Sequence, residues 1–392
     1  MSKYPRFEYS GKAVIRAGKL IAGDLLWTDQ TEPQLRDAFK IANSWRNSHA
    51  YPMRSVRSQV LWHMRDRDIQ GTTSARLKRM PAIRRKLRRD NISLHINQLQ
   101  DLGGVRAILP SINDVRTLIE TLKARSHHEL REEDPYIDSP KDDGYRSHHM
   151  MFNFRDRRNK GIHDGRRVEV QIRTRLQHSW ATAVEAVGMV RGEDLKGGHG
   201  DPDWLRFFML ISAEFAEAER CPVPSIAPVR HTRVDEIKEL NKKLSAAQML
   251  DNLAYVVDWT DGISQSRQGE KPSWTHYLIE YDHVDKQVTI TTYKVPIDAV
   301  ASYDAAEFIE FRSGSDRKNK VLVEVDKIEN LREAYPNYFG DVKLFRKQLL
   351  DITKGKSASE YILPPRETVP PRSSKENPDL AWIRRRRHIR WK

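Results

Sequence analysis

Cysteine is nearly absent from this 392-residue chain, which contains only Cys221. A single cysteine excludes an intramolecular disulfide and any zinc module built on several cysteines. Long apolar runs are missing as well: no stretch approaches the ~20 apolar residues that a membrane-spanning helix needs. Residues 1–20 are polar and lack the apolar core of a signal peptide. Together these absences predict a cytoplasmic protein that does not insert into a membrane.

Acidic residues are outnumbered, with 54 Asp and Glu against 68 Lys and Arg, which gives a formal net charge of +14. A basic surplus of this size favours polyanionic partners such as nucleotides, RNA or an anionic surface. It is also compatible with a basic surface that only aids solubility. Charge alone therefore does not identify the partner.

The length and the 38% content of hydrophobic residues predict more than one folded unit. We expect an irregular segment at 1–30 and a first α+β domain at 31–222. Three prolines between residues 221 and 230 mark a boundary. A long helix and a smaller α+β unit are expected at 231–352, followed by a basic, disordered tail at 353–392.

Periodicity predicts the main elements. The apolar spacing favours helices at 32–48, after Pro52, near Pro81, and at 113–123, 174–189, 201–220, 234–257 and 299–312. Thr174 is a good N-cap for the helix that runs to about residue 189, and Asp201 or Asp203 is expected to cap the helix at 201–220. Alternating or apolar runs favour strands at 102–109, 145–154, 166–173, 276–282, 287–294 and 320–326.

Polar residues that could bind a ligand or take part in a reaction gather in three segments. Asp101 stands at the start of QDLGGVRAI, and residues 140–149 read PKDDGYRSHH. In the third segment, VEVQIRT, Glu169 alternates with valines and therefore faces away from the apolar side of its strand, together with Gln171 and Arg173. A strand face bearing Glu, Gln and Arg fits a binding site better than a structural strand.

These residue types match the needs of a bound phosphate chain. Asp101 and Glu169 are the carboxylates that Mg²⁺ prefers, and Tyr145 offers a flat ring for a base. His149 and His178 are possible donors to phosphate oxygens. Fixed positive charge comes from the block just upstream: Arg76, Lys78, Arg79, Arg84, Arg85, Lys86, Arg88 and Arg89. Each residue taken alone has an ordinary alternative as a turn, packing or surface residue.

Taken together, four segments resemble the synthetase domain of the RelA/SpoT family over roughly residues 50–200: ARLKRMPAIRRKL, QDLGGVRAI, YIDSPKDDGYRSHH and VEVQIRTRLQHSWA. The resemblance implies an α+β fold related to nucleotidyltransferases, with a mixed sheet flanked by helices. It also implies an ATP-dependent pyrophosphokinase. Members of the family transfer pyrophosphate from ATP to the 3′-hydroxyl of GDP or GTP, giving (p)ppGpp.

The resemblance assigns roles by position. Asp101 is similar to the Mg²⁺-binding aspartate of the family, and Glu169 to its second carboxylate, which orients or deprotonates the 3′-hydroxyl. The residues that match the ATP site are Arg76, Lys78, Lys86 and Arg106. Those that match the acceptor site are Lys141, Tyr145, His149, Gln171, Arg173 and His178, with Tyr145 as the stacking ring.

Three positions depart from the family pattern. Ala82 replaces a serine of the basic block, and His148 stands where an apolar residue is usual. Glu185 lies one place later than the glutamate of the small synthetases. These changes concern the geometry of the acceptor site more than that of the ATP site.

The bifunctional relatives place a hydrolase ahead of the synthetase, and the roughly seventy residues before Arg76 are too few for it. We therefore expect a monofunctional synthetase. Residues 231–352 are expected to restrain or gate it, with a dimerisation or packing module as the alternative. Some relatives are toxins that pyrophosphorylate the 3′ end of tRNA, and some of those carry a phage-sensing domain.

The last residues, WIRRRRHIRWK, suit RNA or simply a soluble basic tail. The acceptor therefore stays open between a guanine nucleotide and tRNA. A catalytically silent regulator that binds nucleotide or RNA is a further alternative. The sequence leaves open the trigger, the oligomeric state, and whether the context is starvation signalling or phage defence.

Overall fold

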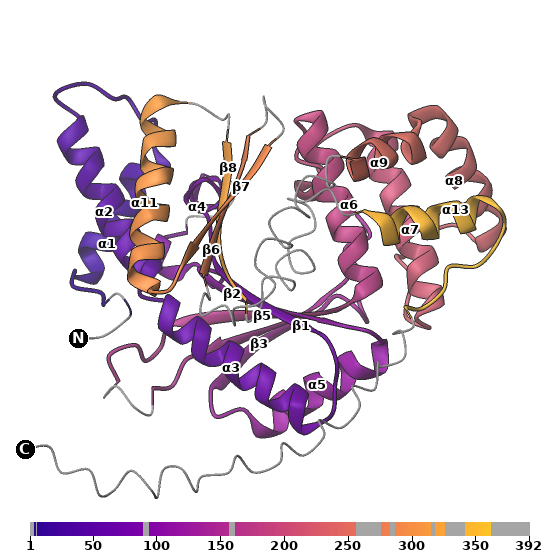
Figure 1. The fold of residues 1–392 in the computed structure, drawn as a ribbon, viewed down its shortest axis with the longest axis horizontal. Helices are drawn as coiled ribbons and strands as arrows, with labels where there is room; N and C mark the ends of the chain where they lie inside the picture. The colour runs from indigo at the N-terminus through magenta and orange to yellow at the C-terminus, as the bar shows by residue number, and fades with distance from the viewer. Residues whose placement is uncertain are drawn as a thin grey trace, which may run out of the picture. The chain divides into compact units, whose positions relative to one another are not determined.

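One mixed β-sheet organises the fold (Figure 1). The structure, a computed structural model, describes residues 4, 6–88, 94–156, 161–255, 276–282, 287–314, 318–325 and 342–361. Over these residues the sheet has eight strands in the order β3-β4-β5-β2-β1-β8-β6-β7. Only β2 and β5 pair in parallel. The strands are β1 Thr72–Leu77, β2 Gly103–Leu109, β3 Glu129–Pro135, β4 His148–Asn153, β5 Arg167–Thr174, β6 His276–Asp282, β7 Gln287–Tyr293 and β8 Lys318–Glu324.

Helices pack around this sheet. Helices α3 and α5 contact the central strands from one side, and α6 leads away from the end of β5 (Figure 1). The α-helices are α1 Gly11–Ala22, α2 Glu32–Asn47, α3 Ala50–Asp66, α4 Met80–Leu87, α5 Ile112–Arg125, α6 Arg175–Arg191, α7 Pro202–Ala218, α8 Arg230–Leu244, α9 Ala246–Tyr255, α11 Pro296–Ser313 and α13 Lys343–Thr353. Two short 3₁₀ helices are η1 Ile96–Gln98 and η2 Leu195–Gly197. No helix in the described part of the chain is both long and apolar enough to cross a bilayer.

Local sequence explains several helix starts. The Thr174 hydroxyl accepts the Gln177 N–H, and the Gln177 side chain accepts the Thr174 N–H, which forms a capping box at α6. Ser111 caps α5 by accepting the N–H of Asp114. Asp201 caps α7, as one of two candidate residues predicted from the sequence. The predicted cap at Thr174 is therefore confirmed.

Three apolar cores hold the elements together. The first lies between the sheet and α3 and α5, and includes Val105, Val168 and Val170. The second joins α6, α7, α8, α9 and α13 around Trp204. The third joins α1, α2 and α4, with Phe308 and Phe311 of α11 packed against it. The alternating valines thus turn one sheet face to a core and leave the other face for polar residues.

The predicted irregular segment at 1–30 is wrong over Gly11–Ala22, which form α1. The Ser10 hydroxyl caps this helix by accepting the Ala13 N–H, and its buried face joins the third core. The predicted long helix at 234–257 is broken, because Ser245 adopts a left-handed conformation with φ 49° between α8 and α9. Asn241 Oδ1 accepts the Ala247 N–H at 3.0 Å and stabilises the break.

Over the residues that the structure describes, the C-terminal half does not form a sheet of its own, which corrects the predicted division at 231–352. β8 pairs antiparallel with β1, with Arg76 opposite Val323, and β6 and β7 extend the sheet further. Met1–Tyr361 accordingly form one compact unit. The free edge of β1 needed a partner, and a distant segment supplies it. Most of the predicted tail, from residue 362 onward, lies outside the described residues.

Candidate active site

On the polar face of the sheet, residues that are far apart in the sequence lie in two rows that run across neighbouring strands. Residues paired across neighbouring strands point to the same side of a sheet. Arg76 pairs with Gly104, which pairs with Glu169. Arg106 pairs with Gln171, which pairs with His149. The glycine between Arg76 and Glu169 leaves the space above β2 open, because a Cβ there would meet nothing closer than 3.8 Å.

A cavity of about 230 Å³ opens beside these rows. The two predicted carboxylates, Asp101 and Glu169, both line it, as do Lys86 and His149. Its other lining residues are Leu94, Gln98, Leu99, Gln100, Glu132, Asp134 and Met151. The structure thus brings Asp101 and Glu169 to the same cavity, while their roles stay a prediction.

Asp101 is held between two lysines. Lys78 Nζ donates to Asp101 Oδ2 at 2.6 Å, and Lys86 Nζ lies 3.3 Å from Oδ1. Burial alone would raise the pKa of Asp101, but the two ammonium groups outweigh it and hold the pKa below the ordinary value. Asp101 therefore remains an anion at neutral pH, ready to bind cations.

Glu169 lies in a line of polar contacts along the same sheet face. His149 Nδ1 lies 3.2 Å from Glu169 Oε1, and Gln171 Nε2 donates to Oε2 at 2.8 Å. Arg173 Nη2 in turn donates to Gln171 Oε1 at 2.6 Å. Burial tends to raise the pKa of Glu169, and the contacts with His149 and Gln171 lower it below the ordinary value. Glu169 is consequently a fixed, ionised carboxylate.

Aromatic rings form the next part of the site. The Tyr145 hydroxyl lies 2.8 Å from His149 Nε2, and Tyr136 packs edge-on against both rings. Lys141 Nζ lies 4.4 Å from the centre of the Tyr136 ring and 5.6 Å from that of Tyr145. The structure therefore brings Lys141, Tyr145 and His149 together. Of the six acceptor candidates, His149 lines the smaller cavity, and the other five line neither of the two cavities described here. His178 is buried in α6.

A larger groove of about 1410 Å³ lies on the other side of Arg76 and Lys78. Arg76 and Arg106 approach Glu185 of α6, which also pairs with Lys196. Burial tends to raise the pKa of Glu185, but these three cations hold it well below the ordinary value. The basic residues that line the groove are Arg76, Lys78, Arg79, Arg84, Arg85, Arg88, Lys196, Arg312 and Lys318.

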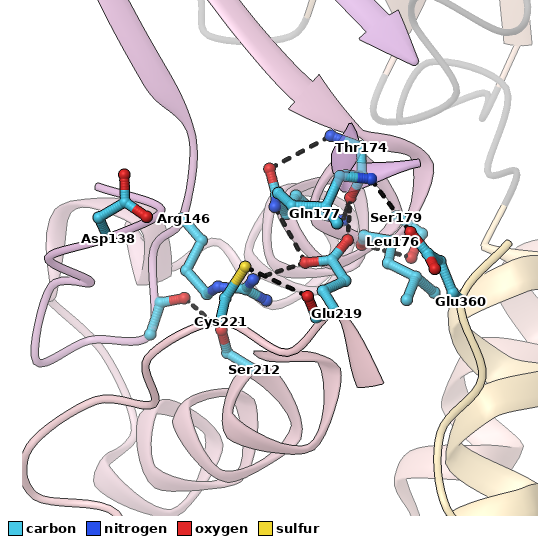
Figure 2. A network of polar contacts seen from close by, with 12 residues as sticks. Asp138, Arg146, Thr174, Leu176, Gln177, Ser179, Ser212, Glu219, Cys221 and Glu360 are labelled. Atoms are coloured by element: carbon cyan, nitrogen blue, oxygen red, sulfur yellow. Dashed lines mark hydrogen bonds and ion pairs between the residues drawn. The ribbon is translucent and has the colours of Figure 1, made fainter. Parts of the chain in front are cut away.

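A buried polar network supports the loop that carries Tyr145 (Figure 2). Glu219, at the end of α7, is 2% exposed and lies at its centre. Arg146 Nη2 donates to Glu219 Oε2 at 2.5 Å, and Gln177 Nε2 donates to the same oxygen at 2.9 Å. The Thr174 hydroxyl donates to Oε1. The network thereby ties the residue after Tyr145 to the end of β5 and the start of α6.

Gly144 in the same loop cannot be replaced without strain. Its φ is +89°, and a Cβ would lie 2.9 Å from Ser212 Cβ. The Ser212 hydroxyl donates to the Gly144 carbonyl at 2.5 Å, so helix α7 holds this turn directly. The turn then presents the Tyr145 ring toward His149.

The carboxylate pair fits a magnesium ion. Asp101 Oδ1 is buried, and Lys86 Nζ approaches it at 3.3 Å, a longer contact than the 2.6 Å between Lys78 Nζ and Oδ2. Two carboxylates on one cavity are the hard oxygen donors that Mg²⁺ selects. Among the described residues no group of three or more His, Cys, Asp and Glu forms a metal cluster, so any remaining ligands would come from the bound substrate and water.

The three residues that depart from the family pattern lie in different parts of the structure. His148 lies on the opposite face of β4 from His149, with its Nε2 2.9 Å from Glu133 Oε2, and so it does not face the cavity. Ala82 and Glu185 both line the larger groove. His148 is therefore removed from the acceptor residues, which corrects the expectation that it alters their geometry.

Sequence reasoning missed three residues of this region. Lys196 follows a helix and carries no periodic signal, while Tyr136 lies at the end of β3, a strand that was not predicted. Glu219 was assigned only to a helix. Its position in the apolar sequence ISAEFAEAER offered one signal, since a glutamate on a buried helix face requires a partner.

Two carboxylates in a cavity, fixed cations around them and a neighbouring aromatic ring define a site for a phosphate-bearing ligand. Comparison with known proteins agrees: the family described as "Region found in RelA / SpoT proteins" matches residues 75–188. The matched residues, 75–188, include all of the predicted site residues.

The chain is similar to three curated proteins named GTP pyrophosphokinase. YjbM of Bacillus subtilis is 34% identical over 110 residues, which cover 28% of this chain and 52% of that protein. YwaC of the same organism is 28% identical over 114 residues, with 28% and 54% covered. The protein from Haemophilus influenzae is 28% identical over 145 residues, with 37% and 18% covered. The chain thus spans about half the length of the first two relatives.

Solved structures show a partial likeness. The small alarmone synthetase 1 from Bacillus subtilis bound to its product pppGpp is 27% identical, with a TM-score of 0.31 over 34% of this chain and 74% of that one. A GTP pyrophosphokinase family protein from Streptococcus pneumoniae is 20% identical, with a TM-score of 0.36 over 49% and 89%. At these TM-scores we draw no conclusion from the likeness.

Proposed function

We propose that this chain transfers the β,γ-pyrophosphate of ATP to the 3′-hydroxyl of GDP or GTP, which makes (p)ppGpp. The observation that carries the proposal is the shared cavity of Asp101 and Glu169, with the cations of the basic block directly beside it. The RelA/SpoT region and the names of the curated relatives support it.

In the proposed reaction, the 3′-oxygen of the acceptor attacks the β-phosphorus of ATP. The bond between that phosphorus and the oxygen bridging to the α-phosphate breaks, and AMP leaves with the bridging oxygen. The hydroxyl proton passes to Glu169 or, through it, to solvent. Because Glu169 is ionised and fixed by His149 and Gln171, it is suited to orient the hydroxyl and accept this proton.

The donor side supplies positive charge to the phosphate chain. Lys78 and Lys86 lie against Asp101, and Arg76 and Arg106 lie on the adjacent sheet face. Fixed cations of this kind stabilise the charge that develops on transferred oxygens. Asp101 and Glu169 would hold Mg²⁺, which neutralises part of the phosphate charge when it is bound.

The acceptor side would bind the guanine nucleotide. Tyr145 provides the ring for the base, and Lys141 and His149 lie near enough to contact its phosphates or ribose. Gln171 donates to Glu169, and Arg173 donates to Gln171, and these contacts differ from the direct acceptor contact predicted for both residues. A direct role for His178 has no support from its buried position.

A second acceptor has one observation in its favour. The groove of about 1410 Å³ is lined by nine basic residues, which include Arg312 and Lys318. A basic groove of this kind suits the backbone of an RNA, so pyrophosphate transfer to the 3′ end of tRNA is the second candidate. If tRNA is the acceptor, residues 231–352 would have to restrain the activity, because a tRNA modified at its 3′ end would arrest growth.

One experiment separates the candidates. The full chain is incubated with Mg²⁺ and γ-labelled ATP, together with either GDP, GTP or deacylated tRNA. Label that appears in the nucleotide supports the first proposal, and label in the tRNA supports the second. Binding of ATP without transfer to any acceptor would contradict both and favour a catalytically silent regulator.

A further inference from the structure

The basic helix α4 lacks a cap of its own. Arg79 is its N-cap, with φ −64° and ψ 143°, and the Arg79 side chain makes no capping hydrogen bond. Pro81, in the first turn, has no N–H to satisfy. The Met80 N–H donates instead to Glu307 Oε1 at 2.9 Å. Glu307 belongs to α11, so the C-terminal half of the chain caps the helix that bears the basic block.

The second oxygen of Glu307 is used by a buried arginine. Arg46 Nη1 donates to Glu307 Oε2 at 2.6 Å, and Nη2 donates to Asp304 Oδ1 at 2.5 Å. Arg46 is 0% exposed. Burial tends to lower its pKa, but the two carboxylates raise the pKa above the ordinary value, so the guanidinium remains charged. Glu307 is thus fixed by charge in the position where it caps α4.

Arg46 also contacts the segment whose side chain binds Asp101. Arg46 Nη1 also donates to the backbone carbonyl of Lys78 at 3.3 Å. The side chain of Lys78 then donates to Asp101 at 2.6 Å. An unbroken line of contacts therefore runs from α11 through Arg46 and Lys78 to the cavity. The pairing of β8 with β1 at Arg76 adds a second link between the two halves of the chain.

We propose that Glu307 is a positioning residue for the ATP side of the site. Through the Met80 N–H and through Arg46, it sets the place of the segment that carries Lys78, Arg79 and Lys86. The inference rests on the proposed function, because Lys78 and Lys86 are among the cations assigned to the ATP phosphates. It also implies that a chain cut at residue 231 lacks part of its donor site, whatever further control the C-terminal half exerts.

The test compares two carboxylates of α11 in the full chain. Glu307→Gln keeps the size of the side chain and removes its charge. Asp298→Asn removes an exposed charge from the first turn of the same helix and serves as the control. The dissociation constant of a non-hydrolysable ATP analogue is measured by calorimetry with Mg²⁺ present. We expect about a tenfold increase for Glu307→Gln, as for the loss of one charge-assisted hydrogen bond, and no change for Asp298→Asn.

Two further measurements separate positioning from general destabilisation. The dissociation constant of GDP should stay the same in Glu307→Gln, since the acceptor residues lie on other elements. In a Lys78→Met background, Glu307→Gln should add little to the loss of ATP affinity, because its effect acts through that segment. A full additive loss, or an equal loss of GDP affinity, would show a merely structural role.

The outcomes distinguish this inference from the proposed function. If the wild-type chain binds the analogue and Glu307→Gln binds it equally well, the positioning role is wrong while the proposed function stands. If the wild-type chain binds no ATP analogue, both are wrong. If Glu307→Gln does not fold, Glu307→Asp takes its place, because it keeps the negative charge near Arg46 and shortens the side chain that caps Met80. Unchanged ATP affinity in folded Glu307→Asp would then overturn the inference.

Discussion

Replacing Glu219 by glutamine should destabilise the protein and weaken the acceptor site together. Glu219 accepts hydrogen bonds from Arg146, Gln177 and Thr174, and both Glu219 and Arg146 are 2% exposed. The substitution removes the negative charge and leaves the Arg146 guanidinium buried without an ionic partner. Figure 2 shows Glu219 between Arg146, which follows Tyr145 in the chain, and Thr174 and Gln177 at the start of α6. We therefore expect the stability of the α6–α7 region and the position of Tyr145 both to depend on this group.

The magnitude follows from the cost of an uncompensated buried charge. Breaking a buried ion pair by removing one partner costs about 3–5 kcal/mol. The glutamine retains an acceptor oxygen for Gln177 or Thr174, so we expect the lower end, about 3 kcal/mol. A loss of this size lowers the melting temperature by roughly 6 °C in a domain of a few hundred residues. The double variant Arg146→Met, Glu219→Leu should recover part of the loss, because it buries no lone charge.

The assay is urea unfolding followed by tryptophan fluorescence. Asp235→Asn is the control, since Asp235 forms only an exposed pair with Lys238 and should leave the midpoint unchanged. The Michaelis constant for the acceptor should rise in Glu219→Gln while that for ATP stays within twofold. A Glu219→Gln protein with a wild-type midpoint would refute the reasoning, as would a double variant less stable than either single one.

Three further changes test other parts of the structure. The pKa of Asp101 in the folded protein is held below its ordinary value of 3.8, so the stabilising effect of the Asp101 carboxylate should be complete above about pH 5 and should be lost as the pH falls through the folded pKa. The unfolding free energies of the wild type and of Asp101→Asn should therefore converge in acid. A difference between these two free energies that does not narrow would contradict the lowered pKa. Tyr145→Phe removes the hydroxyl that meets His149, so the acceptor Michaelis constant should rise about fivefold at unchanged stability, and a wild-type value would exclude this contact from binding. Ser245→Gly should stabilise the protein by about 0.5 kcal/mol in thermal melts, because glycine adopts the φ of 49° without strain, whereas a loss of stability would mean that the serine side chain matters.

Periodicity was sufficient for most of the secondary structure. The valine alternation at Val168 and Val170 fixed both the strand and the outward direction of Glu169, because only one face of that strand could be apolar. The cap at Thr174 was equally clear, since its partner Gln177 lies in the local sequence. Local signals of this kind need no knowledge of the tertiary fold.

Local signals of this kind did not predict which strands pair when they lie far apart in the sequence. The C-terminal strands were expected in a separate unit, yet β8 completes the sheet at β1, because strand propensity does not specify a partner. The edge strand β3 was missed, since its sequence ELREEDP is polar and alternates weakly. The cap of α4 by Glu307 joins residues 227 positions apart and leaves no local pattern. The candidate site was thus predicted at its carboxylates and cations, while the contacts that hold it in place required the structure.

The most direct test of the central claim is the transfer of labelled pyrophosphate by carboxylate variants. With Mg²⁺, γ-labelled ATP and GDP or GTP, the wild-type chain should produce labelled guanosine tetra- or pentaphosphate. Asp101→Ala and Glu169→Ala should each abolish the product, whereas Glu120→Gln, an exposed control on α5, should produce it at the wild-type rate. Full transfer by either alanine variant would contradict the assignment of the carboxylate pair, and the absence of any labelled nucleotide with the wild-type chain would contradict the proposed function.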